Sequence, residues 1–462
     1  MRPDAAAQPF APPMPPLAHP GTTGLGVLAG LRRNGFSAFP ARCLDEPVVR
    51  LRLPGGRALV LASAPDSVRH VLQAHAEDYR RMAVGRRVLG PIVGRGLLVS
   101  EGEAWRRQRR TMAPAFTPRT VPVMAGHVMR HAEAACMHLD SAAPGERVDL
   151  LGAMQSLSLN IAAASMFSLE AESFGGELRG MVSRYMATIG RPSPGDFLVP
   201  KGVPTPLALR RALFRRRWRR LIAAIIAQRR AQDGADCSQS GSAPPRDLFD
   251  LMAAAHGDGA DDLLADEVAT MIVAGHETTA LAMFWALLLL AQVPHWQAAV
   301  AAEARGLDLS PDRAAAALPA LARTRAVVQE ALRLYPPGFV TAREAVRAHE
   351  VCGVTVPARA VVLVPFWMLH RNRRWWAAPD AFDPDRFLHG AEPDRFAFLP
   401  FGAGPHACIG SQLAMTEAVL VLARLLRDRE VSVVGSRAVL PVGVLSTRPD
   451  HAPDFLLRPR QR

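Results

Sequence analysis

Lysine is almost absent from this 462-residue chain, and cysteine and long apolar runs are scarce. Lys201 is the only lysine, so arginine carries nearly all of the positive charge behind the formal net charge of +13. Alanine is also abundant, and this pairing is typical of a GC-rich coding sequence. The charge therefore does not by itself indicate a nucleic-acid partner, and we expect none, although a basic surface favours an acidic protein partner.

The few cysteines and the missing targeting signals exclude several protein classes. The five cysteines are odd in number, widely spaced and without a CxxC pair, which excludes a disulfide framework and a zinc site. No apolar stretch resembles a membrane span or a signal peptide. We therefore expect a soluble protein of the reducing cytoplasm. The cysteines are Cys43, Cys136, Cys237, Cys352 and Cys408.

The hydrophobic content of 49% is enough for a large core. Residues 1–20 are rich in proline and alanine and predict a flexible or extended leader. A β-hairpin is expected at 48–63, followed by a helix that Ser63 caps. Most of 103–335 has helical periodicity, interrupted by a polar loop at 233–245. Short β-strands follow residue 336.

Three further helices are predicted. The span 261–293 predicts one helix of about 30 residues, long and apolar enough to run through the middle of the fold. The last helix is expected at 411–428. A third, at 210–230, alternates arginines with apolar residues; this favours an amphipathic helix with a solvated basic face, with membrane-surface contact as the alternative.

One cysteine lies in a glycine-rich loop directly before the last helix. Residues 398–410 read FLPFGAGPHACIG, and Cys408 is followed by the helix N-terminus. Glycines such as Gly402 let the backbone approach a bulky group, and a helix N-terminus lowers a thiol pKa. Phe401 could shield the sulfur from water. The residues alone leave three interpretations open: a nucleophile, a metal ligand or an inert buried cysteine.

The pattern Phe401-Gly402-x-Gly404-x-His406-x-Cys408-x-Gly410 resembles the haem-binding loop of the cytochrome P450 monooxygenases. The resemblance covers roughly residues 40–455. It implies that Cys408 ligates the iron of haem b (iron protoporphyrin IX) and that His406, where the family usually has arginine, contacts a propionate in a pH-dependent way. It also implies a single, mainly α domain over 21–462 with a minor β region and a long central helix over the haem.

Two motifs of the same family concern the surroundings of the haem. Glu330 and Arg333, three apart on one helix, imply a buried triad that an arginine completes. Arg386, in the sequence FDPDRF, is the preferred third member, and Arg395 in a second PDRF is the alternative. The implied propionate partners are Trp105 and Arg109, at i and i+4 on one helix, and Arg343.

The sequence AGHETT at 274–279 lies inside the long helix. Glycine and paired threonines are poor helix formers, so we expect a local distortion there. The resemblance implies that Thr278 hydrogen-bonds dioxygen and its proton-donating water, and that Glu277 relays protons inward. His276 is interpreted as structural. This acid–alcohol pair disfavours two rivals, a non-catalytic haem sensor or carrier and a peroxide-driven hydroxylase.

Substrate and partners are implied less directly. The chain has no flavin or iron–sulfur module, so it needs O2 and a separate ferredoxin- or flavodoxin-type donor with its reductase, docked near Arg106, Arg107 and Arg110. A small lipophilic substrate, a fatty acid or a terpenoid, is expected. Arg80, Arg81 or Arg191 is a candidate carboxylate anchor. The expected pocket residues are Ile272, Ala274, Phe339, Val340, Val442, Val444 and Leu445.

Overall fold

The computed structural model describes residues 10–460, with gaps at 142, 144, 172–173, 194–195, 197–202, 204, 237–246, 257–260 and 390–393. Cys237 and most of the loop predicted at 233–245 lie outside the described residues. The part of that loop that is described is helical, because helix α9 continues to Asp236. The other four cysteines are free thiols.

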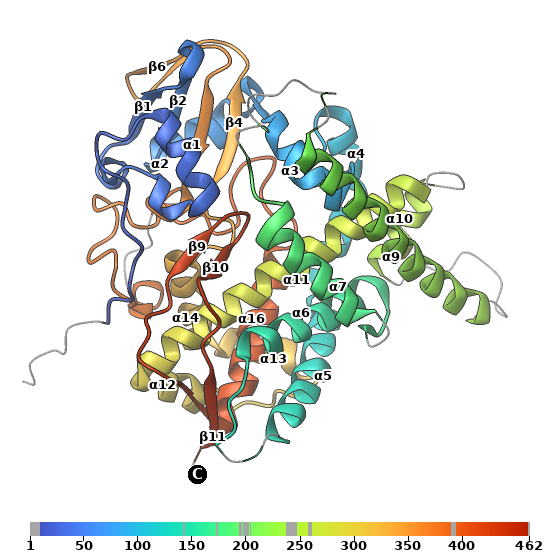
Figure 1. The fold of residues 1–462 in the computed structure, drawn as a ribbon. Helices are drawn as coiled ribbons and strands as arrows, with labels where there is room; N and C mark the ends of the chain where they lie inside the picture. The colour runs from blue at the N-terminus through green and yellow to red at the C-terminus, as the bar shows by residue number, and fades with distance from the viewer. Residues whose placement is uncertain are drawn as a thin grey trace, which may run out of the picture.

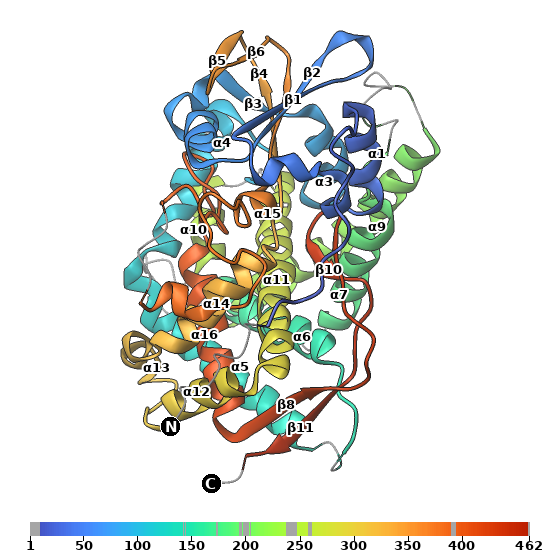
Figure 2. The same cartoon turned by 90° about the vertical axis from the view of Figure 1, so that its left-hand side faces the viewer.

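Helix α11 (Asp261–Gln292) passes through the middle of the molecule, as Figures 1 and 2 show. Its 32 residues confirm the predicted long helix. It is apolar on nearly every side because it packs against helices from all directions, chiefly α6 (Leu150–Phe167), α14 (Ala322–Leu334) and α16 (Ser411–Asp428). The last of these has the predicted bounds.

Two helices, α6 and α11, are long and apolar enough to cross a membrane, but 61% and 83% of their most apolar windows are buried inside the protein. Both are therefore core helices of this fold. The remaining helices are α1 (Gly24–Arg33), α2 (Pro65–Arg69), α3 (Ala83–Val93), α4 (Gly102–Met112), α5 (Val121–Asp140), α7 (Gly175–Arg184), α9 (Pro206–Asp236), α10 (Leu248–His256), α12 (Pro294–Arg305), α13 (Ala314–Ala317) and α15 (Phe366–Leu369).

A five-stranded sheet, in the order β1-β2-β7-β4-β3, lies at one end of the helical body. The predicted hairpin is confirmed as β1 (Val48–Arg52) and β2 (Ala58–Ala62). Strand β3 (Tyr79–Arg81) pairs with β4 (Thr341–Ala345), and this register sets Arg81 opposite Arg343. The other strands are β5 (His349–Val351), β6 (Val354–Val356), β7 (Val361–Val364), β8 (Arg429–Val433), β9 (Pro441–Gly443), β10 (Thr447–Pro449) and β11 (Phe455–Pro459).

Two local predictions differ from the structure. The N-cap of α2 is Ala64 and not Ser63, because the Ser63 hydroxyl instead donates to the Glu46 carbonyl. The expected leader is described only from Phe10 onward. There the Phe10 carbonyl accepts a hydrogen bond of 2.8 Å from the Phe382 amide, so this part of the leader is held against the body.

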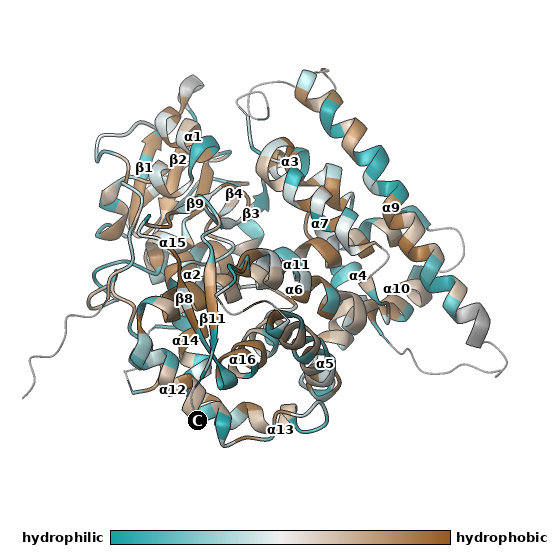
Figure 3. Ribbon diagram, turned by 60° about the horizontal axis from the view of Figure 1, so that its bottom comes forward, coloured by the Kyte–Doolittle hydropathy of each residue, from teal (hydrophilic) through white to brown (hydrophobic). Residues whose placement is uncertain are grey.

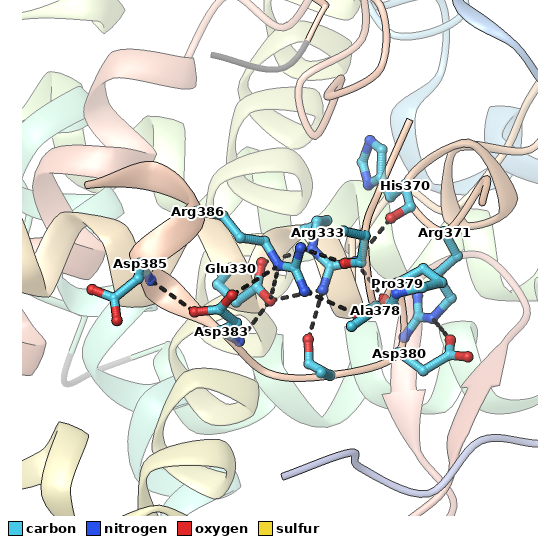
Figure 4. A network of polar contacts seen from close by, with 12 residues as sticks. Glu330, Arg333, His370, Arg371, Ala378, Pro379, Asp380, Asp383, Asp385 and Arg386 are labelled. Carbon is cyan, nitrogen blue, oxygen red and sulfur yellow. Dashed lines mark hydrogen bonds and ion pairs between the residues drawn. The ribbon is translucent and has the colours of Figure 1, made fainter. Parts of the chain in front are cut away.

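A buried ionic network supports the loop that leads to Cys408 (Figure 4). Arg333 donates to both carboxylate oxygens of Glu330 at 2.6 and 2.7 Å, and neither side chain is exposed. Arg386 reaches the same carboxylate at 3.4 Å and donates to the carbonyls of residues 377 and 378. Arg395 instead lies over the Phe396 ring. The third member of the triad is therefore Arg386.

We expect Arg386→Ala to lower the free energy of unfolding by about 3 kcal/mol, because it breaks a buried charge network. Arg395→Ala is the matched control; its exposed side chain only stacks on Phe396, so the loss should stay below about 1 kcal/mol. Chemical denaturation of both variants measures the difference. Equal losses would contradict the assignment of Arg386.

Candidate active site around Cys408

A cavity of about 450 Å³ lies between α11, α16, α4, β4 and the loop that carries Cys408. Apolar side chains supply most of its wall, but several charged and hydroxyl groups also face it. The predicted cofactor-binding and catalytic residues all line this cavity, namely Cys408, Thr278, Glu277, Trp105, Arg109, Arg343, His406, Phe401, Gly402 and Gly410. The structure therefore brings together every predicted cofactor-binding and catalytic residue.

The loop before α16 presents the Cys408 sulfur to this cavity. The Cys408 amide donates to the Phe401 carbonyl at 2.8 Å, which folds the loop back on itself. Gly404 has φ +70°, and a Cβ there would lie 1.7 Å from the Leu72 carbonyl oxygen. Only glycine meets both conditions, and the close approach is to another backbone segment. The predicted approach of the loop to a bulky group stays a prediction.

The predicted lowering of the thiol pKa is wrong for the protein by itself. Burial raises the pKa of Cys408 above its ordinary value, and the hydrogen bond at Gly410 and the Arg109 charge oppose this only in part. The sulfur is open to the cavity, but the protein atoms packed around it favour the neutral thiol. A metal cation bound at the sulfur would reverse this balance, because coordination deprotonates a thiol.

Positive charge collects on one side of the cavity, and Arg81 belongs to it. Arg109 donates to the Ala407 carbonyl at 2.8 Å, and Arg81 contacts the His406 Nδ1 atom at 3.0 Å. The Trp105 and His406 rings lie 4.2 Å apart. Among the described residues, no carboxylate forms an ion pair with Arg81, Arg109 or Arg343, although burial lowers the pKa of all three.

This unpaired charge fits a bound group that carries carboxylates. Burial and the three neighbouring arginines lower the pKa of His406 to about 3. The expected pH dependence of a propionate contact at His406 stays a prediction. The two propionates of a haem would supply the missing anions, and Cys408 would hold the iron.

Thr278 and Glu277 lie on an unbroken helix, so the predicted distortion of α11 is not found. The Thr278 hydroxyl donates to the Ala274 carbonyl at 2.6 Å, which holds the side chain without opening the helix. The buried Glu277 carboxylate pairs with Arg448 of β10 at 2.6 Å. His276 is fully buried and does not line the cavity; burial lowers its pKa to about 4.

Three residues of the cavity were not identified from the sequence as parts of the site, namely Arg81 in its present role, Ser446 and Glu417, and neither was Arg448, which pairs with the cavity residue Glu277. Glu417 is 2% exposed and lines the cavity, and burial raises the pKa of its carboxyl to about 8. The Ser446 hydroxyl is buried without a hydrogen-bond partner among the described residues. Little in the sequence distinguishes these residues. Ser446 is a single serine, Glu417 is an acid within an apolar helix, and Arg81 and Arg448 are two of many arginines.

The predicted pocket lining and carboxylate anchors are largely corrected. Ala274 and Leu445 line the cavity, whereas Ile272, Phe339, Val340, Val442 and Val444 do not. Arg80 pairs with Glu344, and Arg191 donates to the carbonyl of Ala187 in the helical turn that precedes it. Arg81 faces the cavity but lies within the cation cluster. No predicted arginine is left free at the cavity mouth.

The comparisons agree with this geometry. Residues 20–445 match the family model described as cytochrome P450. Cyclooctat-9-en-7-ol 5-monooxygenase of Streptomyces melanosporofaciens is 33% identical, with 91% of each chain covered. Cyclooctatin synthase of the same organism is 32% identical, with 81% of each covered. A 6-coordinated cytochrome P450 from Thermus thermophilus shares 25% identity with a TM-score of 0.67, covering 90% of this chain and 95% of that one.

The family match spans nearly the whole chain, and the cavity holds the family's residues in place. A haem-thiolate cofactor is what this family implies, and the residues around Cys408 fit it. The chain therefore belongs to the cytochrome P450 superfamily and is a monooxygenase that acts on an organic substrate.

Proposed function

We propose that this protein binds haem b through Cys408 and inserts one atom of O2 into a lipophilic substrate by hydroxylation or epoxidation. The observation that carries the proposal is a lone cysteine facing an apolar cavity whose wall holds three arginines without anions. Arg81, Arg109, Arg343, Trp105 and His406 would receive the propionates. When bound, a thiolate-ligated haem supplies the redox chemistry that splits dioxygen.

Thr278 and Glu277 would handle protons in the cavity. The Thr278 hydroxyl hydrogen is committed to the Ala274 carbonyl, so its oxygen can accept a hydrogen bond from the cavity side. Glu277 forms an ion pair with Arg448 and is reached by the Gln155 amide at 3.5 Å. A carboxylate that leaves its arginine partner can carry a proton inward and then form the ion pair again.

The cavity favours an uncharged lipophilic substrate. Its wall is mostly apolar, and the arginines that line it, Arg81, Arg109 and Arg343, belong to the cofactor cluster. This favours a terpenoid over a fatty acid, which would need a cation of its own. A relative named as a monooxygenase of cyclooctat-9-en-7-ol, an uncharged alcohol by its name, supports an uncharged substrate. The unpartnered Ser446 hydroxyl offers one polar contact to an oxygen on that skeleton.

A separate donor would supply the electrons, and we infer a ferredoxin or flavodoxin with its reductase. Helix α4 is tied to the Cys408 loop by the Arg109–Ala407 hydrogen bond, and its exposed face carries Arg107 and Arg110. Arg106, on the same face, pairs with Glu103. An acidic donor docked there would lie close to the iron ligand.

The rival functions receive less support. A sensor or carrier has no use for a buried acid beside a cavity-facing hydroxyl, and this chain holds both at Glu277 and Thr278. A peroxide-driven hydroxylase needs neither the acid–alcohol pair nor a basic docking face. We also infer that residues 21–462 form one catalytic domain and that the protein is soluble in the cytoplasm.

Replacing the sulfur is the direct test of the proposal. We expect Cys408→Ala to lose the absorption band that reports thiolate ligation in the reduced, carbon-monoxide-bound protein. Cys352→Ala is the matched control, because Cys352 is an exposed free thiol outside the cavity, and it should keep the band. If the band survives in Cys408→Ala, the assignment of the iron ligand is wrong.

Thr278→Ala should uncouple electron consumption from product formation and release peroxide. We expect product per electron pair to fall at least ~10-fold, because positioned proton transfer contributes about 10²- to 10⁴-fold. Thr278→Ser keeps the hydroxyl and should stay near the unaltered coupling. Simultaneous assays of donor oxidation, peroxide and product measure the effect; unchanged coupling in Thr278→Ala would refute the role.

Ser446→Ala tests the proposed polar contact. With a terpene alcohol and the hydrocarbon of the same skeleton as probes, difference spectra give both dissociation constants. We expect the variant to weaken only the alcohol, by about threefold to tenfold, since one hydrogen bond contributes roughly 0.5–1.5 kcal/mol. Equal changes for both probes would mean that Ser446 does not contact the substrate oxygen.

A further inference from the structure

A second cavity of about 460 Å³ opens on the outside of the molecule, between α7 and the first half of α9. Its size falls within the range of small-molecule sites. Buried side chains of Met181 and Phe214 form its floor, together with Gly180. Leu213 adds an apolar side chain that is 56% exposed. The cavity is thus an apolar hollow that is open to solvent.

The rim of this outer cavity carries more positive than negative charge. Arg184, Arg210 and Arg217 line it with a single acid, Glu177, which pairs with Arg217 at 2.8 Å. Three arginines and one glutamate leave two positive charges. Among the described residues, Arg184 and Arg210 form no ion pair.

Most other arginines of α9 pair with acids from elsewhere in the fold, in the pairs Arg211–Asp196, Arg215–Asp266, Arg219–Asp262, Arg229–Asp247 and Arg230–Asp261. Arg216 and Arg220, which are exposed and lie outside the cavity, are exceptions. Arginine on this helix therefore usually meets a carboxylate of the protein. At the outer cavity a carboxylate from a ligand would complete the same pattern.

We propose that the outer cavity binds an anionic amphiphile with a single hydrocarbon chain, of the medium-chain carboxylate class. Its carboxylate would lie between Arg184 and Arg210, because a guanidinium group matches a carboxylate in shape and charge. Its chain would cover Gly180, Met181 and Phe214. Nothing in the proposed catalytic function requires this site.

A membrane surface is the competing occupant of this face. A helix that lies on a bilayer presents a continuous apolar side outward. In α9 the apolar side is turned inward, since Trp218, Ile222 and Ile225 are each at most 3% exposed. Figure 3 shows α9 along the edge of the molecule with hydrophilic and hydrophobic residues alternating. A concave apolar hollow with a cationic rim suits one chain better than a bilayer.

The outer cavity is joined to the haem cavity by the π-helical turn Tyr185–Ile189, which follows α7. Ile189 lines the outer cavity, and Met186, three residues earlier, lines the haem cavity. Gly190, the next residue, lies against Leu445, which also lines the haem cavity. A ligand in the outer cavity would therefore shift residues that line the substrate cavity and change how tightly the substrate binds. This coupling rests on the proposed function, whereas binding to the outer cavity does not.

Binding can be isolated by blocking the inner cavity. Holoenzyme saturated with an azole inhibitor is titrated with dodecanoate, below its micellar concentration, in a calorimeter. We expect one dodecanoate per chain, and dodecanol to bind at least ~10-fold more weakly, because it lacks the charge that the arginines recognise. The azole's own absorption shift shows whether the haem and its thiolate ligand are present, independently of the outer site.

Variants then locate the site. Arg184→Gln with Arg210→Gln should weaken dodecanoate at least ~10-fold and leave dodecanol unchanged. The matched control is Arg216→Gln with Arg220→Gln, two exposed arginines of α9 that do not line the cavity. Gly180→Leu should abolish binding of both probes, because a Cβ there meets no atom within 4 Å and the side chain would fill the hollow.

Three results would overturn the proposal. The first is no dodecanoate binding to the azole-saturated holoenzyme. The second is equal affinity for dodecanoate and dodecanol in the unaltered protein, which needs no variant to fold. The third is binding only to vesicles of anionic lipid, which would make this face a membrane contact. In each case a normal azole spectrum would leave the haem assignment intact.

Discussion

The site depends on a mismatch of charge that the protein does not resolve by itself. Arg81, Arg109 and Arg343 lose much of their hydration at the cavity wall without an ion pair to a carboxylate among the described residues, and only the Glu101 charge acts on Arg81 and Arg343 from nearby. Cys408 has the opposite problem, because burial favours its neutral thiol over the thiolate. One bound group with two carboxylates and a metal cation would relieve both. Cofactor binding should therefore contribute directly to the stability of the fold.

The elements that hold this mismatch in place lie far apart in the chain. The pairing of β3 with β4 sets Arg81 opposite Arg343 across more than half of the sequence. The close approach of Gly404 to the Leu72 carbonyl fixes the position of the Cys408 loop. The Glu330–Arg333 pair anchors the segment that leads to it. None of these groups takes part in the reaction, but each contact restricts movement of the sulfur relative to the arginines.

The sequence predicts the parts of this site that are local in the chain. Spacing around Cys408, the periodicity of 261–293 and the choice of Arg386 over Arg395 all depend on neighbours within one segment, and the structure confirms them. The Arg448–Glu277 pair joins positions 171 residues apart, and no local pattern distinguishes Arg448 from the other arginines.

The two wrong predictions, on the Cys408 thiol and on helix α11, failed because contacts distant in the sequence were not considered. The lowered thiol pKa was predicted from the helix N-terminus and the loop amides, but desolvation depends on the whole cavity wall and outweighs them. The predicted distortion of α11 followed from poor helix formers at 275–279. Packing against α6 and α14 and the bond from Thr278 to Ala274 keep that helix continuous. Tertiary contacts thus overrode local preference in both places.

Arginine richness has a structural meaning beyond coding bias. Most arginines of α9 meet acids, so their charge is neutralised within the fold. Unpaired arginines occur at many exposed positions, but one group, Arg81, Arg109 and Arg343, is partly buried at the haem cavity, and others lie at the rim of the outer cavity and on the exposed face of α4. The partly buried group feels salt less than the exposed ones, whose interactions are screened within about 8–10 Å at physiological ionic strength. On the proposed functions, the same residue type would hold a cofactor inside and bind anions reversibly, and in a salt-dependent way, outside.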